Sequence, residues 1–163
     1  MIPQRFAFTA VSPTYNREVI TDAFISAPTP NNIPVQLLNV KALWDTGASN
    51  SVIKPHIVNQ LGIKADGVAK SINAGGENTV NTYLVNIALP NKMLIPMVRV
   101  TECAETPSSK FDIIIGMDII SLGDLSISGQ GIKRVVSFCM PSAVVIDFVQ
   151  MLQPKDTQTY NRQ

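Results

Sequence analysis

The feature that most constrains the fold is a strand pattern that runs directly into an acidic turn. Over residues 38–44 every even-numbered side chain is apolar, which is the period of a strand with one face against a core. Asp45, Thr46 and Gly47 follow at once. These are common turn residues, so by themselves they predict only a turn at the end of a strand. Their meaning depends on the segments around them.

Short strand patterns separated by turn residues dominate the rest of the chain, which favours a mainly β fold. We find no long linker and no repeat, so we predict one domain over residues 1–153 and a polar tail over residues 154–163. The other predicted strands lie at residues 6–9, 19–25, 68–72, 79–89, 94–100, 113–115 and, as a hairpin, 126–140.

Helices are expected to be few and short. Residues 55–62 begin with Pro55 and end at Gly62, residue types that suit the start and the end of a helix. One or two helical turns are predicted over residues 117–122. Residues 143–152 have helical spacing but are rich in branched side chains, and a helix is favoured there.

Composition excludes several classes of function. Apolar residues make up 45% of the chain and charged residues 15%, which is typical of a globular protein. The 13 basic and 12 acidic residues form no basic block, so no nucleic-acid partner is expected. No apolar run approaches the ~20 residues that span a bilayer, so no membrane partner is expected. The N-terminus carries no signal-peptide pattern, and a cytoplasmic location is therefore predicted.

Metal and nucleophile chemistry also find little support. The sequence holds one histidine, His56, and two cysteines, Cys103 and Cys139, so no metal site and no cofactor are expected. Ser49 and Ser51 have no histidine base nearby in sequence, which disfavours a serine nucleophile. We expect the cysteines to be reduced core thiols, with a disulfide left open if the protein is exported.

Four segments in order give the acidic turn a more specific interpretation. Ala42-Leu43-Trp44-Asp45-Thr46-Gly47-Ala48-Ser49 is followed by the predicted helix at residues 55–61, by the glycine-rich turn Ala74-Gly75-Gly76 and by Ile113-Ile114-Ile115-Gly116. This order resembles the retropepsin family of aspartic peptidases, which includes the retroviral proteases. The resemblance covers roughly residues 35–125 of the chain.

The resemblance implies a fold, a reaction and a set of residues. The fold would be half of a retropepsin-like closed or orthogonal β-barrel, with a flap hairpin and one or two short helices. The chain would act as a homodimeric endopeptidase on a peptide or protein substrate, with Thr46 bonding across the dimer and Gly47 admitting the partner backbone. The implied catalytic residues are Asp45, Thr46 and Gly47, and the implied substrate-binding residues are Ala48, Ser49, Ile72, Ala74, Gly75 and Gly76.

The chemistry of peptide hydrolysis explains the need for two chains. Two adjacent carboxylates that share one proton can both activate water and protonate the product, as is known for aspartic proteases. This chain supplies one Asp-Thr-Gly, so a two-fold dimer would provide the second acid. Ala48 offers no hydroxyl to the carboxylate, which favours an optimum below neutral pH but less acidic than that of pepsin.

Two departures from the family pattern leave alternatives open. Trp44 is bulkier than the aliphatic residue expected before the aspartate, and Met117-Asp118 stands where retroviral enzymes carry arginine and asparagine. The bulk of Trp44 and the length of the chain, which continues for about forty residues beyond Gly116, make a catalytically silent module for peptide binding or dimerisation the alternative function. Asp118 could in principle partner Asp45 within one chain, but its place at the start of a predicted helix favours a role at that helix terminus. An enzyme that processes only itself or one partner is a third possibility.

Overall fold

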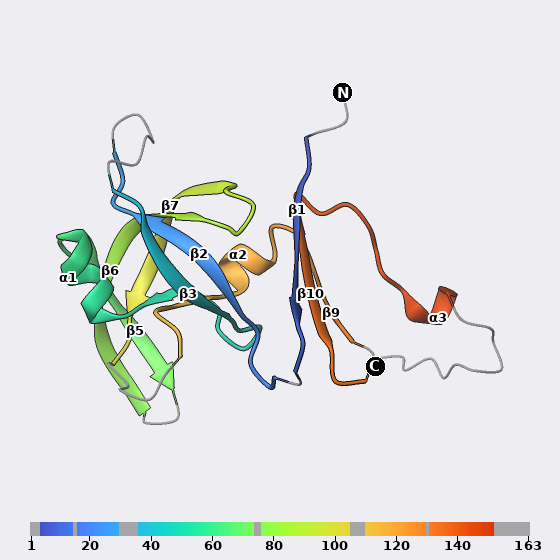
Figure 1. The fold of residues 1–163 in the computed structure, drawn as a ribbon. Coiled ribbons are helices and arrows are strands. Elements are labelled where there is room, and N and C mark those ends of the chain that lie inside the picture. The colour runs from blue at the N-terminus through green and yellow to red at the C-terminus, as the bar shows by residue number, and fades with distance from the viewer. Residues whose placement is uncertain are drawn as a thin grey trace.

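The chain is mainly β, as the sequence predicts. A computed structural model describes residues 4–14, 16–29, 36–73, 76–104, 110–129 and 131–151 (Figure 1). Its helices are α1 (Pro55–Leu61), α2 (Met117–Ile120) and α3 (Phe148–Met151). Its strands are β1 (Phe6–Ser12), β2 (Ile20–Ser26), β3 (Leu38–Trp44), β4 (Val52–Ile53), β5 (Gly67–Asn73), β6 (Gly76–Ala88), β7 (Leu94–Glu102), β8 (Ile113–Ile115), β9 (Asp124–Ser128) and β10 (Arg134–Met140).

The larger sheet is a curled, barrel-like layer of seven strands in the order β2-β3-β8-β4-β7-β6-β5. It curls far enough that β2 also pairs with β6, through Ile25 opposite Ile87. At its centre β8 runs parallel to β3 and antiparallel to β4. This pairing places the end of β3 beside the end of β8, with Trp44 opposite Ile115. Both strands therefore deliver their following loops to the same edge of the sheet.

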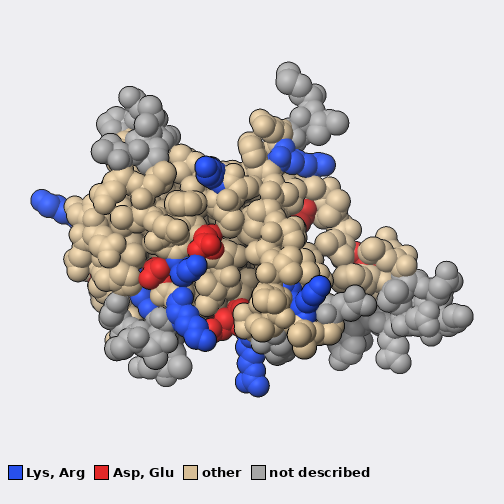
Figure 2. Space-filling model, viewed as in Figure 1, with Lys and Arg blue, Asp and Glu red and all other residues tan. Residues whose placement is uncertain are grey.

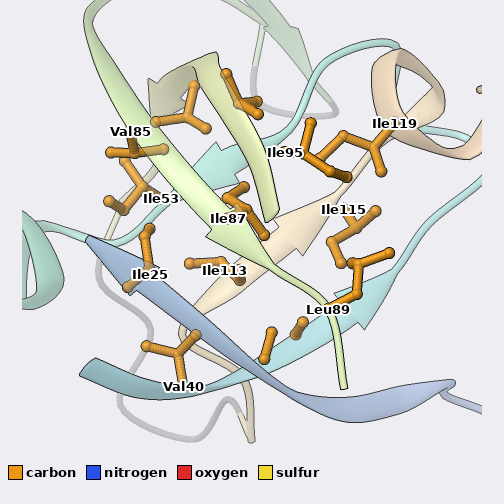
Figure 3. Packing of buried hydrophobic residues seen from close by; sticks show 14 of the residues in the cluster. Ile25, Val40, Ile53, Val85, Ile87, Leu89, Ile95, Ile113, Ile115 and Ile119 are labelled. Atoms are coloured by element: carbon orange, nitrogen blue, oxygen red, sulfur yellow. The ribbon is translucent and has the colours of Figure 1, made fainter. Parts of the chain in front are cut away.

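The core lies inside this curl. Figure 3 shows Ile25 from β2, Ile87 from β6 and Ile113 from β8 converging on one another. None of these three side chains is more than 1% exposed. Burial of one such side chain is worth about 1.5–3 kcal/mol. The prediction for residues 38–44 is confirmed, because the buried side chains of β3 all lie on its even-numbered face.

A second sheet of three strands, in the order β1-β10-β9, joins the two ends of the described chain. It lies beside the larger sheet in Figure 1. The contact is aromatic: the ring of Trp44 lies 5.7 Å from that of Phe8 on β1 and 5.0 Å from that of Phe138 on β10. We call these three strands the terminal sheet. The terminal sheet therefore contacts the larger sheet at the last residue of β3.

The local predictions for helices are confirmed in one case and corrected in another. In α1, Pro55 occupies the first turn and Gly62 follows the helix with a φ of +64°, a conformation that glycine adopts without strain. The helix predicted over residues 143–152 is reduced to the single turn of α3, which buries none of its residues. Branched side chains disfavour a helix in this segment, and its first residues are held in another conformation.

Asp124 at the start of β9 holds that segment. Its carboxylate accepts hydrogen bonds from the Ser142 hydroxyl and from the backbone N–H groups of Ala143 and Val144. These bonds lower the pKa of Asp124 below its ordinary value of 3.8, the Ala143 N–H having the largest effect. The ionised carboxylate is thus preferred in the folded state.

An acid dependence of stability follows from this lowered pKa. A lowered folded-state pKa stabilises the fold above the ordinary value, and this contribution is lost as the pH falls below 3.8. We therefore expect Asp124→Asn to be less stable than the parent at neutral pH, and the gap to narrow in acid. Urea unfolding of both proteins at neutral pH and at about pH 3 measures this. An equal gap at both pH values would contradict it.

The described residues show no concentration of charge on the face seen in Figure 2 and no sign of a membrane span, a metal site or a disulfide. Figure 2 shows acidic and basic side chains next to one another on the same face. No helix in the described part of the chain is long and apolar enough to cross a membrane. Among the described residues no group of three or more His, Cys, Asp or Glu side chains is arranged to hold a metal ion. No disulfide joins Cys103 and Cys139.

Candidate active site

Asp45 stands at the first position after β3, in a tight turn. Its backbone N–H donates to the Ile115 carbonyl at 3.0 Å, which continues the pairing of β3 with β8. The Ala48 N–H donates to the Asp45 carbonyl at 3.2 Å and closes the turn. The Gly47 N–H donates to the Asp45 carboxylate at 2.8 Å, so one carboxylate oxygen is oriented by the turn itself.

The turn presents its residues outward. Asp45 and Ala48 are half-buried, and Thr46, Gly47 and Ser49 are exposed. A Cβ atom at Gly47 would lie 3.2 Å from the Asp45 carboxylate, which is a tight contact. Glycine at this position therefore lets the carboxylate approach the backbone N–H. The structure thus brings five of the sequence-predicted site residues together on one accessible loop.

The segment after β8 packs against this loop. The Met117 N–H donates to the Ala48 carbonyl at 2.8 Å and the Asp118 N–H to the Ser49 carbonyl at 3.2 Å. Gly116 is required by the closeness of the two backbones, because a Cβ atom there would lie 2.6 Å from the carbonyl carbon of Asn50. The loop after β3 and the start of α2 therefore form one unit.

Side chains complete this unit at its far end. The Asp118 carboxylate accepts from the Ser51 N–H at 3.0 Å and from the Ser51 hydroxyl at 2.8 Å. It also accepts from the Ile119 N–H at 3.0 Å within the first turn of α2, but the N-cap of this helix is Gly116 and no side chain caps it. Sequence reasoning missed the partnership with Ser51. A hydroxyl downstream of an Asp-Thr-Gly is a weak signal, and nothing local shows which distant acid it contacts.

Trp44 forms the support behind the loop. Its indole N–H donates to the Thr21 hydroxyl at 3.0 Å in a buried position, and its ring contacts the terminal sheet. Its bulk therefore fills the space between the two sheets and leaves the Asp45 turn intact.

The predicted flap is a long hairpin of β5 and β6, paired from Gly67 opposite Thr82 to Asn73 opposite Gly76. Gly76 has a φ of +108°, a conformation open to glycine. Ala74 and Gly75 lie outside the described residues, as does the side chain of Ile72. Among the described residues no hydrogen bond joins this hairpin to residues 45–51. The roles of these flap residues stay predictions.

The base of the hairpin is fixed. Asp66, just before β5, accepts from the Thr82 hydroxyl at 2.8 Å and pairs with Arg99 of β7 at 3.0 Å. The Thr82 hydroxyl is the main cause that lowers the pKa of Asp66, with a smaller effect from Arg99. The ionised Asp66 thus ties the hairpin to the neighbouring strand, at the end opposite its turn.

The acidic turn and its surroundings can be compared with known proteins. A family model described as aspartyl protease matches residues 33–119, which is more than half of the chain. The chain belongs to the aspartyl protease family. The match includes the Asp45 loop, the β5–β6 hairpin and the first residues of α2. No curated protein matches the sequence significantly.

Solved structures of retropepsin-like proteases are similar to this chain, and the first of them supports a retropepsin-like fold. The retropepsin-like aspartic protease from Rickettsia conorii is 15% identical, with a TM-score of 0.53 over 84% of this chain and 96% of that one. EIAV protease complexed with the inhibitor HBY-793 is 25% identical, with a TM-score of 0.46 over 66% and 90%. The retroviral protease-like domain of Ddi1 from Leishmania major is 19% identical, with a TM-score of 0.43 over 64% and 78%.

Proposed function

We propose that this member of the aspartyl protease family is a homodimeric endopeptidase in which Asp45 of each chain activates water between two carboxylates. The observation that carries the proposal is the Asp45 turn. It places one oriented carboxylate on an accessible loop whose two ends are anchored. Such an arrangement holds an acid in a fixed position without burying it, as general acid–base catalysis requires.

The need for a second chain rests on the number of available acids. Asp118 is the acid tied most directly to the loop, but its two oxygens accept from Ser51 and Ile119. Both of its oxygens are therefore occupied, and it is not the second acid of the reaction. A two-fold axis near the turn would bring Asp45 beside its copy, since an isologous contact repeats the same patch on both chains.

The reaction then follows from the shared proton. Two carboxylates a few ångström apart cannot both ionise easily, so the pair holds one proton between them. The ionised carboxylate removes a proton from water, which attacks the peptide carbonyl. The protonated carboxylate stabilises the developing oxyanion by a hydrogen bond. As the peptide bond breaks, the leaving nitrogen takes up the proton that the other carboxylate removed from water, so the pair again holds one proton. Thr46 and Gly47 would brace the turn against its copy.

Substrate would be held in an extended form between the loop and the hairpin. Extended peptides bind by backbone hydrogen bonds along a strand-like surface, with side chains alternating into pockets. Ala48 and Ser49 on the loop, and Ile72, Ala74, Gly75 and Gly76 at the hairpin, are the proposed contacts. A hairpin that closes over the peptide excludes water and strengthens the local electrostatics.

Cleavage of a peptide library tests the proposal. We expect hydrolysis of internal peptide bonds at mildly acidic pH, with a rate that falls on dilution below the dimer dissociation constant. A statin-type inhibitor, which mimics the tetrahedral intermediate, should stop it. Tight binding of an extended peptide without any cleavage would instead support the silent binding module. The bulk of Trp44 suggested that alternative, but Trp44 lies behind the loop and no longer favours it.

A further inference from the structure

We infer that Asp118 is a positioning residue for the reaction, and that it acts by holding Ser51 so that both ends of the catalytic loop are fixed. The inference rests on the proposed function and deepens it, because it assigns a task to an acid outside the Asp-Thr-Gly turn.

The loop over residues 45–51 is held by residues 115–118 and, at its last residue, by β7, where the Thr101 N–H donates to the Ser51 carbonyl at 3.1 Å. At the first end of the loop the Asp45 N–H donates to the Ile115 carbonyl. In the middle the carbonyl groups of Ala48 and Ser49 accept from the backbone of α2. All of these are backbone bonds, which any residue could make at these positions. At the last end of the loop the contact with this segment depends also on two side chains, those of Ser51 and Asp118.

That last end is Ser51, which has no exposed surface. Its hydroxyl donates to Asp118 at 2.8 Å and accepts from the Gly116 N–H at 3.1 Å. Its backbone N–H donates to the other Asp118 oxygen at 3.0 Å. The hydroxyl therefore acts both as a hydrogen-bond donor and as a hydrogen-bond acceptor. Loss of either partner would leave polar groups unsatisfied beside the loop.

Retroviral enzymes carry an asparagine at this position, but in this chain Ser51 directs two donors at the side chain, and a carboxylate suits them better than an amide. Asp118 receives donors on both oxygens: the Ser51 N–H on one, and the Ser51 hydroxyl and the Ile119 N–H on the other. Hydrogen bonds to an ionised acceptor are roughly twice as strong as neutral ones. An asparagine of the same shape has one oxygen and one NH2 group, so a donor would face a donor on one side.

The consequence for Asp45 is one of placement. Loss of the Asp118 carboxylate would keep the backbone bonds at Asp45 and along the loop but remove those to the Ser51 N–H and hydroxyl, so the turn that carries Asp45 would shift. A displacement of about 1 Å in a reacting group can lower the rate by about 100-fold. Binding of the extended peptide depends on a broader surface and should change less. The effect is thus expected in kcat more than in KM.

The experiment compares Asp118→Asn with a matched control, Asp124→Asn. Asp124 accepts from one hydroxyl and two backbone N–H groups, the same types of donor as Asp118, but at residues 142–144 and away from the loop. We expect Asp118→Asn to lower kcat by about 10- to 100-fold with KM within about twofold. Asp124→Asn should leave kcat unchanged under conditions where both variants are folded.

Ser51→Ala provides the second arm. If the two side chains act as one unit, Ser51→Ala should lower kcat like Asp118→Asn, and the double variant should be no worse than either single one. Full kcat in Asp118→Asn, an equal loss in Asp124→Asn, or additive losses in the double variant would overturn the inference.

Hydrogen exchange separates this inference from the proposed function. Native-state exchange at the Ser51 and Gly116 amides needs no substrate. We expect faster exchange at both amides in Asp118→Asn but unchanged rates in Asp124→Asn. If the parent protein cleaves no peptide, the proposed function fails while this measurement still decides whether Asp118 fixes the loop. Unchanged exchange in Asp118→Asn would overturn the inference by itself.

Discussion

Asp45→Asn is expected to lower peptide hydrolysis by about 10³-fold or more, while the fold and the dimer persist. The amide cannot take a proton from water, so neither half of the shared-proton chemistry remains. Its carbonyl oxygen can still accept from the Gly47 N–H, which keeps the turn in place. Turnover of a fluorogenic peptide, measured beside the circular dichroism and solution mass of both proteins, checks this.

Mixing the two proteins tests whether the acids come from different chains. If subunits exchange, an equal amount of the Asp45→Asn chain should convert about half of the parent chains into mixed dimers and halve their activity. The Ser142→Ala change lies outside the loop, so a chain that carries it serves as a control. Its addition should not lower the activity of the parent protein. Parent activity that is unaffected by excess Asp45→Asn chain would show that each chain works alone. It would remove the dimer from the proposal.

What the sequence could predict is local. The strand over residues 38–44 follows from its period of two, and α1 follows from Pro55 and Gly62 at its ends. The place of Asp45 at the end of a strand also follows, because strand and turn residues are neighbours in the sequence. The order of these segments was then sufficient to indicate the family that the matching model supports.

What the sequence could not predict depends on distant partners. Ser51 and Asp118 lie 67 residues apart, and their contact exists only because β8 runs beside β3. The prediction of a helix over residues 143–152 was wrong for its first half. The Asp124 carboxylate accepts hydrogen bonds from residues 142–144 and holds them in a non-helical conformation. In both cases a side chain from another element decides the local structure.

Trp44 is another residue whose role depends on partners that are distant in the sequence. In the sequence its bulk is a departure from the aliphatic residue expected before the aspartate. In the fold it is 6% exposed and its ring contacts those of Phe8 and Phe138, with its indole N–H bonded to Thr21. It therefore joins the terminal sheet to the strand that carries Asp45.

Trp44→Ala should lower the free energy of unfolding by about 3–5 kcal/mol, the usual effect of replacing a buried tryptophan by alanine. The change removes two ring contacts of roughly 5–6 Å between centroids, each worth about 0.5–1.5 kcal/mol beyond its buried area. It also leaves the buried Thr21 hydroxyl without its donor. Urea unfolding followed by circular dichroism measures the difference.

Two further variants divide this effect into its parts. Trp44→Phe keeps an aromatic ring but has no N–H for Thr21, so we expect a smaller loss of about 1–3 kcal/mol. Val145→Ala removes a side chain that is 93% exposed and should change stability by less than about 0.5 kcal/mol. If Trp44→Ala behaved like Val145→Ala, the terminal sheet would be held by something other than this aromatic contact. Since Trp44 directly precedes Asp45, the support behind the Asp45 turn would then have to come from the backbone bonds to β8 alone.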